Sequence, residues 1–211
     1  MPLFARWRAQ REQQRRAAAF VAAMAADPRP EEVAWLAEVA TGEDQDHARW
    51  ELRYARRALG LLAAERDALD DRTGSAVARA LGEFLERDPE VAADMRAMAD
   101  RQFNARLSAY RDILASRPGA PVTLRLGQML LAFSGGPIGL GHAAVARAGE
   151  LMAGYLAEAN DRLRDTYGAV ALPDDKIPLL EEFLLLVTRI TGATLLVHTG
   201  SDIKHPCRSS H

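Results

Sequence analysis

Residues 43–71 constrain the fold of this chain more than any other segment. When the segment is drawn as a helix at 100° per residue, its apolar side chains cover an arc of about 200°. An arc that wide predicts burial on more than one side, so we expect a central helix, roughly 40 Å long. The opposite arc is interpreted as a solvated face, and its charged residues are Arg49, Arg53, Arg56, Arg57 and Asp67.

The rest of the chain before residue 173 favours helices as well. Alanine, leucine, arginine and glutamate dominate it, and all four are strong helix formers. Two further long segments carry apolar stripes at helical spacing. We therefore expect an all-α fold, a helical bundle of about six to eight helices. The expected helices cover residues 3–26, 30–40, 43–71, 75–87, 89–116, 122–133, 142–167 and 177–190.

The composition of the chain changes near Leu172. Both lysines, the single cysteine and three of the five histidines lie after this point. The change indicates three parts: a basic amphipathic helix over 1–28, a helical body over 29–172 and a compositionally distinct C-terminal tail over 173–211. The tail is interpreted as one more helix followed by a flexible end, either as a native module or as an appended segment.

Bulk properties place the chain in a broad class. Its 211 residues are 48% hydrophobic, which is enough for a sizeable core. A net charge of −2 does not favour a nucleic-acid or membrane protein. A single cysteine excludes an internal disulfide framework, and no uncharged stretch reaches the roughly 18 apolar residues of a membrane span. The first residues lack the apolar run of a secretory signal, so we expect a cytoplasmic protein.

The first helix carries a heptad seam with a polar centre. Its seven positions are Leu3, Trp7, Gln10, Gln14, Ala17, Val21 and Met24. The seam can pack on the body, associate with a second copy or a protein partner, or lie on an anionic membrane. We predict that residues 1–26 bind a partner protein or a second copy of the chain, and that arginines of the central helix take part in this binding. The predicted partner-binding residues are Leu3, Trp7, Arg11, Arg15, Arg49, Arg53, Arg56 and Arg57.

Nucleic-acid binding is an alternative use of the central helix. Its arginines alternate with Trp50 and Tyr54, as in proteins that stack bases on aromatic rings. The wheel separates the two kinds of residue, because the aromatic rings lie on the apolar arc and most arginines on the other. Nucleic acid is therefore not the favoured partner.

Two features of the body indicate other chemistries. His47 and Glu51, one turn apart, and Glu65 fall inside the apolar arc and suit a metal ion or a bundle enzyme. The alternative is that both glutamates pair with arginines of neighbouring helices. A glycine-rich stretch, 134–141, precedes an expected helix and suits an anion at its N-terminus. A dinucleotide fold would need a preceding strand, and none is expected.

The tail carries four metal-binding side chains within fourteen residues: His198, His205, Cys207 and His211. Such donors can hold zinc, although their order matches no zinc-finger pattern. We expect no cofactor, with zinc as the alternative. The sequence thus predicts a non-catalytic helical protein for interaction or assembly. The alternatives are a metal-dependent or small-molecule-binding bundle enzyme, and a peripheral membrane or nucleic-acid module.

Overall fold

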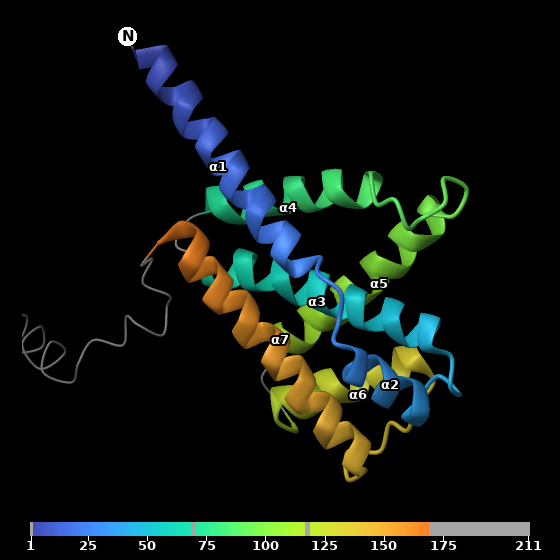
Figure 1. The fold of residues 1–211 in the computed structure, drawn as a ribbon. Coiled ribbons are helices and arrows are strands. Elements are labelled where there is room, and N and C mark those ends of the chain that lie inside the picture. Colours follow the sequence, from blue (N-terminus) through green and yellow to red (C-terminus); the bar gives the residue numbers. More distant parts are fainter. Residues whose placement is uncertain (1, 69–70, 117–118, 169–211) are drawn as a thin grey trace, which may run out of the picture. The chain divides into compact units, whose positions relative to one another are not determined.

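The computed structural model describes residues 2–68, 71–116 and 119–168, with side chains from residue 6. Within these ranges all regular structure is helical, which confirms the all-α prediction (Figure 1). None of the described helices is long and apolar enough to cross a membrane. The expected tail and its helix over 177–190 lie outside the described residues. The helices are α1 (Pro2–Met24), α2 (Pro30–Val39), α3 (Gln45–Asp67), α4 (Asp71–Glu86), α5 (Arg96–Ala115), α6 (Val122–Ser134) and α7 (Ala143–Tyr167).

Helix α3 is the centre of the described bundle and contacts each of the six other described helices. Every residue from 51 to 64 is buried, and Leu52, Ala55 and Leu59 expose no surface. This burial confirms the prediction of a central helix. The buried surface is also wider than the predicted apolar arc of about 200°, because neighbouring segments cover the middle turns of α3 on all sides.

The prediction that Arg53, Arg56 and Arg57 lie on a solvated face is wrong. Their exposed fractions are only 4%, 7% and 3%. The segments that cover this side of α3 bring carboxylates with them, and a guanidinium can be buried when charged partners satisfy it. Asp67 is also buried, whereas Arg49 is exposed as expected. The resulting pairs are Arg53 with Asp27 and Glu90, Arg56 with Glu158, and Arg57 with Asp88.

Helix α5 begins seven residues later than the sequence predicts, at Arg96 rather than at residue 89. Asp88, which directly precedes the expected start of this helix, accepts a hydrogen bond from the Glu90 amide at 3.1 Å and pairs with Arg57. Glu90 reaches Arg53 at 2.6 Å. These two tertiary ion pairs hold residues 88–90 as a turn, and this arrangement replaces the first turns of the expected helix.

Helices α6 and α7 cross at two glycines. A Cβ atom on Gly127 would lie 2.5 Å from the Val145 carbonyl oxygen and would also overlap the Gly149 amide nitrogen. A Cβ atom on Gly149 would lie 2.7 Å from the Thr123 carbonyl oxygen. The two backbones therefore touch directly, and no side chain fits between them.

Replacing Gly127 by alanine is expected to lower the free energy of unfolding by about 2–3 kcal/mol, because the new methyl group must push α6 away from α7. Urea unfolding followed by circular dichroism measures the change. Gly154 on α7 is the matched control, since a Cβ there meets nothing within 4 Å. Gly154→Ala should be neutral or stabilising by up to about 1 kcal/mol. Equal losses in both variants would contradict the close crossing.

Candidate functional site

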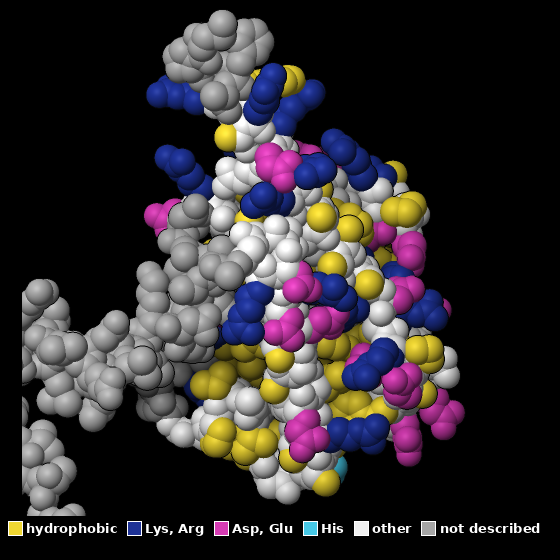
Figure 2. All heavy atoms as spheres, turned by 60° about the vertical axis from the view of Figure 1, so that its left-hand side comes forward, with side chains coloured by type: hydrophobic (Ala, Val, Ile, Leu, Met, Phe, Trp, Pro, Cys, Tyr) yellow, Lys and Arg dark blue, Asp and Glu magenta, His cyan; other side chains and the backbone are white. Residues whose placement is uncertain are grey.

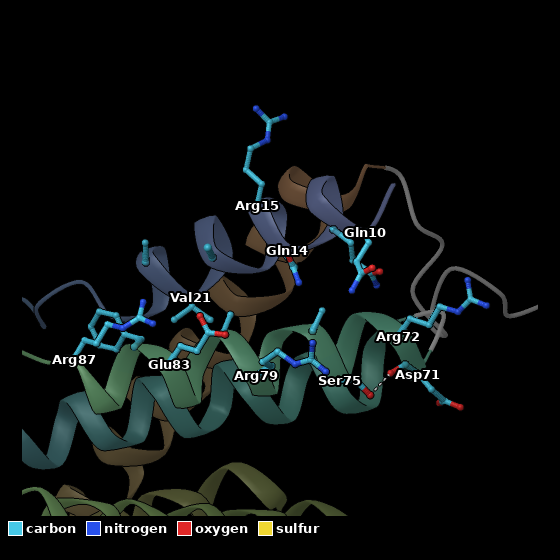
Figure 3. Close-up of a pocket in the computed structure, with 16 residues that line it drawn as sticks. Gln10, Gln14, Arg15, Val21, Asp71, Arg72, Ser75, Arg79, Glu83 and Arg87 are labelled. Atoms are coloured by element: carbon cyan, nitrogen blue, oxygen red, sulfur yellow. Dashed lines mark hydrogen bonds between the residues drawn. The ribbon is translucent and has the colours of Figure 1, made fainter. Parts of the chain in front are cut away.

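A groove of about 920 Å³ runs between α1 and α4. The two helices lie side by side, with Gln10 and Gln14 toward the start of α4 and Val21 toward its end (Figure 3). The floor of the groove is apolar and built from small residues and one aromatic ring. The floor residues are Ala18, Val21, Ala22, Ala76, Ala80 and Phe84.

The sequence of α4 explains why the groove is open. One stripe of this helix, with Val77 and Leu81, is buried in the core. The adjacent stripe, Ala76, Ala80 and Phe84, recurs every four residues and is only half-buried. Because two of its three side chains are single methyl groups, they leave space between α4 and the neighbouring α1. The floor is thus an apolar surface at helical spacing with no described side chain filling it.

The heptad seam of α1 is divided between the core and the groove. Its C-terminal positions are buried, with Ala17, Val21 and Met24 exposed by 0%, 3% and 4%. Its polar centre, Gln10 and Gln14, lines the groove. The remaining positions, Leu3 and Trp7, lie farther toward the N-terminus. Trp7 is 52% exposed, and Leu3 precedes the first described side chain.

Arginines dominate the rim of the groove. The groove is lined by four arginines and only two carboxylates: Arg15, Arg72, Arg79 and Arg87, with Asp71 and Glu83. Two of these arginines, Arg72 and Arg79, belong to α4, and Arg87 directly follows it; within the described ranges these three have no carboxylate partner and are exposed. Arg15 differs, because it pairs with Glu12 at 2.9 Å.

The N-terminal part of α1 adds to this positive charge. Figure 2 shows arginine side chains gathered around that end of the helix. Arg11 stacks on Trp7, with its guanidinium carbon 4.2 Å from the ring centroid. Hydrogen bonds from Arg15 and then Arg16 lower the pKa of Glu12, so this carboxylate stays ionised and is already engaged. The groove therefore joins an apolar floor to an excess of unpaired positive charge.

The structure does not bring the predicted partner-binding residues into one site. Arg15 lines the groove, and Arg11 lies on the same helix. Arg49 is exposed on α3, 3.8 Å from Asp46, and does not line the groove. The other three predicted arginines of α3 are buried in ion pairs, as described above. Of the predicted partner-binding residues, only Arg15 therefore lines the groove.

The two glutamates considered as metal ligands are held by arginines. Glu51 is 2% exposed and receives a bidentate pair from Arg106, with Nε 2.8 Å from Oε2. Glu65 pairs with Arg111 at 2.9 Å, so the alternative that both glutamates bind neighbouring arginines is confirmed. His47 Nε2 lies 3.5 Å from Glu51 Oε1.

Two further predicted sites have different outcomes. Within the described part of the chain, no three histidine, cysteine or acidic side chains gather closely enough for a metal ion. The zinc candidates His198, His205, Cys207 and His211 lie outside it. At the start of α7, His142 Nδ1 accepts a hydrogen bond from the Ala144 amide at 3.1 Å. An internal cap therefore already engages one of the amides that an anion would use.

The contribution of α4 is what sequence reasoning missed. Arg72, Arg79 and Arg87 recur at spacings of seven and eight residues, which places them on one side of a helix. The half-buried stripe of Ala76, Ala80 and Phe84 runs beside them. The arginine spacing together with this apolar stripe was the sequence signal that could have indicated the groove. Comparisons with protein-family models, with curated proteins and with solved structures found no match to this chain.

Proposed function

We propose that this protein binds an acidic amphipathic helix of a partner protein in the groove between α1 and α4. The observation that carries the proposal is the row of three exposed arginines, Arg72 and Arg79 on α4 and Arg87 directly after it, unpaired within the described residues, beside an apolar floor. A partner helix with leucines on one face and carboxylates flanking them would cover the floor and pair with the row. Helix-in-groove recognition uses this division between apolar anchors and charged edges.

The dimensions of the groove suit a helix of four to five turns. Helix α4 contributes 16 residues, which corresponds to roughly 24 Å of axis. The floor residues Ala76, Ala80 and Phe84 are spaced by four, so a second helix can place its own side chains between them. With α1 on the other side, the partner would form the third helix of a local bundle.

Charge favours an acidic partner over a second copy of this chain. Between Arg6 and Arg16, α1 carries five arginines and one acidic residue, Glu12. Placing that segment in the groove of another copy would bring it against the arginines of α4. Like charges placed together oppose binding, whereas glutamates at the same positions gain attraction. Self-association through residues 1–26, which the seam also suggests, is therefore the competing outcome.

A designed peptide pair tests the charge requirement. One 18-residue helical peptide carries leucines on one face and glutamates beside them, and its counterpart carries lysines in place of the glutamates. Fluorescence anisotropy with the full-length protein should show saturable binding of the glutamate peptide. Binding of the lysine peptide should be at least about tenfold weaker, and added salt should weaken the glutamate complex. Equal binding of both peptides, or none, would overturn the proposal.

Charge reversal in the row of Arg72, Arg79 and Arg87 tests the location. The variant Arg79→Glu/Arg87→Glu should bind the glutamate peptide about tenfold or more weakly, since each exposed pair contributes up to about 1 kcal/mol and becomes repulsive. The control, Arg101→Glu/Arg162→Glu, changes two exposed arginines outside the groove and should bind normally. A dimer seen by light scattering and abolished only by Arg79→Glu/Arg87→Glu would instead show that the groove holds a second copy.

A further inference from the structure

A second pocket, of about 400 Å³, lies where α3 meets the start of α5. Trp50 and Tyr54 of α3 form an aromatic wall, with ring centroids 5.7 Å apart. Met95 and Met98 lie at its edge and are 44% and 38% exposed, which makes them two of the large apolar side chains that the described surface presents. Methionine side chains are flexible and polarisable, so they adapt to a flat ring. A pocket of this size suits a small molecule.

The charged groups of this pocket already have partners. Arg106 holds both oxygens of Glu51, and Arg53 holds both oxygens of Glu90. A charged ligand entering the pocket would lose hydration without meeting an unpaired counter-ion among the described lining residues, which is costly. The charge pattern therefore favours an uncharged ligand.

Hydrogen-bonding groups remain on one side of the pocket. Gln102 lies with its Oε1 3.4 Å from the Tyr54 hydroxyl, at the long end of hydrogen-bond distance. Burial raises the pKa of Tyr54, so its hydroxyl stays protonated and can donate. His47, 43% exposed, also lines the pocket. An aromatic wall with a few polar groups at one side is the usual character of a ligand site.

We propose that the pocket between α3 and α5 binds an uncharged aromatic compound, with its ring against Trp50 and its polar group toward Gln102. The methionines then cover the outer face of the ring. This site is separate from the α1–α4 groove, because the two pockets share no lining residue. The inference therefore does not depend on the proposed partner helix.

Three probes that share one ring system test the charge argument: indole, tryptamine and indole-3-acetate. Calorimetric titration of the full-length protein should show saturable indole binding. Both charged probes should bind at least about tenfold more weakly, because neither finds a free counter-ion. Absence of saturable indole binding would overturn the inference, as would a charged probe that binds as tightly as indole.

A matched pair of double variants tests the location. Met95→Ala/Met98→Ala removes the methionine edge and should raise the dissociation constant of indole about tenfold or more, since it removes most of the apolar contact on one face. The control, Ile138→Ala/Leu140→Ala, changes two residues that are 53% and 44% exposed and lie outside the pocket. The control should bind indole within twofold of the parent. Equal weakening in both variants, or none in the methionine variant, would overturn the assignment.

Discussion

Replacing Arg106 by alanine is expected to lower the free energy of unfolding by about 3–5 kcal/mol. The substitution would leave the Glu51 carboxylate buried without its cation, since Arg106 and Glu51 are only 8% and 2% exposed. The guanidinium also lies 4.5 Å from the Phe133 ring centroid and 5.2 Å from that of Tyr54, and these cation–π contacts would be lost. Urea unfolding followed at 222 nm measures the loss.

Arg111 is the matched control for this prediction. It lies on the same helix and also pairs with a glutamate of α3, Glu65, but the two side chains are 48% and 37% exposed. Arg111→Ala should therefore cost less than about 1 kcal/mol. Adding Glu51→Gln to Arg106→Ala should recover part of the loss, because it removes the unpaired charge. Equal losses from Arg106→Ala and Arg111→Ala would contradict the role of burial.

Local periodicity was sufficient to predict the described helices, apart from the start of α5, and the central position of α3. A wide apolar arc is a property of neighbouring residues, and Leu52, Ala55 and Leu59 are buried as that arc requires. Periodicity could not show whether the arginines of α3 are solvated or buried. Their carboxylate partners are 26 to 102 residues away in sequence, and only the folded chain brings Asp27 or Glu158 to α3.

The same limit explains what was found and missed at the candidate sites. The seam of α1 was visible in the sequence. The groove, however, also needs α4 as its second wall, and the sequence does not show that α4 lies beside α1. Helix α5 shows the reverse case: Asp88 has the local signature of a helix cap, and the tertiary pair with Arg57 overrides it. Where a charged side chain is buried, local propensity is a weak guide, because leaving that charge unpaired costs about 3–5 kcal/mol, which exceeds the roughly 1 kcal/mol of a cap.

The pair of Arg57 and Asp88 is the most buried ion pair among the described residues, with side-chain exposures of 3% and 4% and an N···O distance of 3.0 Å. Burial lowers the pKa of Arg57, although the Asp88 carboxylate acts in the opposite direction. The guanidinium also lies 5.0 Å from the Phe84 ring centroid. In general the cost of desolvating two buried charges largely offsets their attraction, so we expect the pair to contribute little net stability, whereas removing either partner leaves the other charge buried and unpaired.

A double-mutant cycle tests this difference. Arg57→Met leaves Asp88 buried and unpaired, and should lower the free energy of unfolding by about 3–5 kcal/mol. Asp88→Asn keeps the side-chain oxygen that accepts from the Glu90 amide, yet it leaves Arg57 unpaired and should be similarly damaging. The double variant buries no charge and should lie within about 1.5 kcal/mol of the parent. Additive losses in urea unfolding would show instead that each side chain stabilises the fold independently of the other.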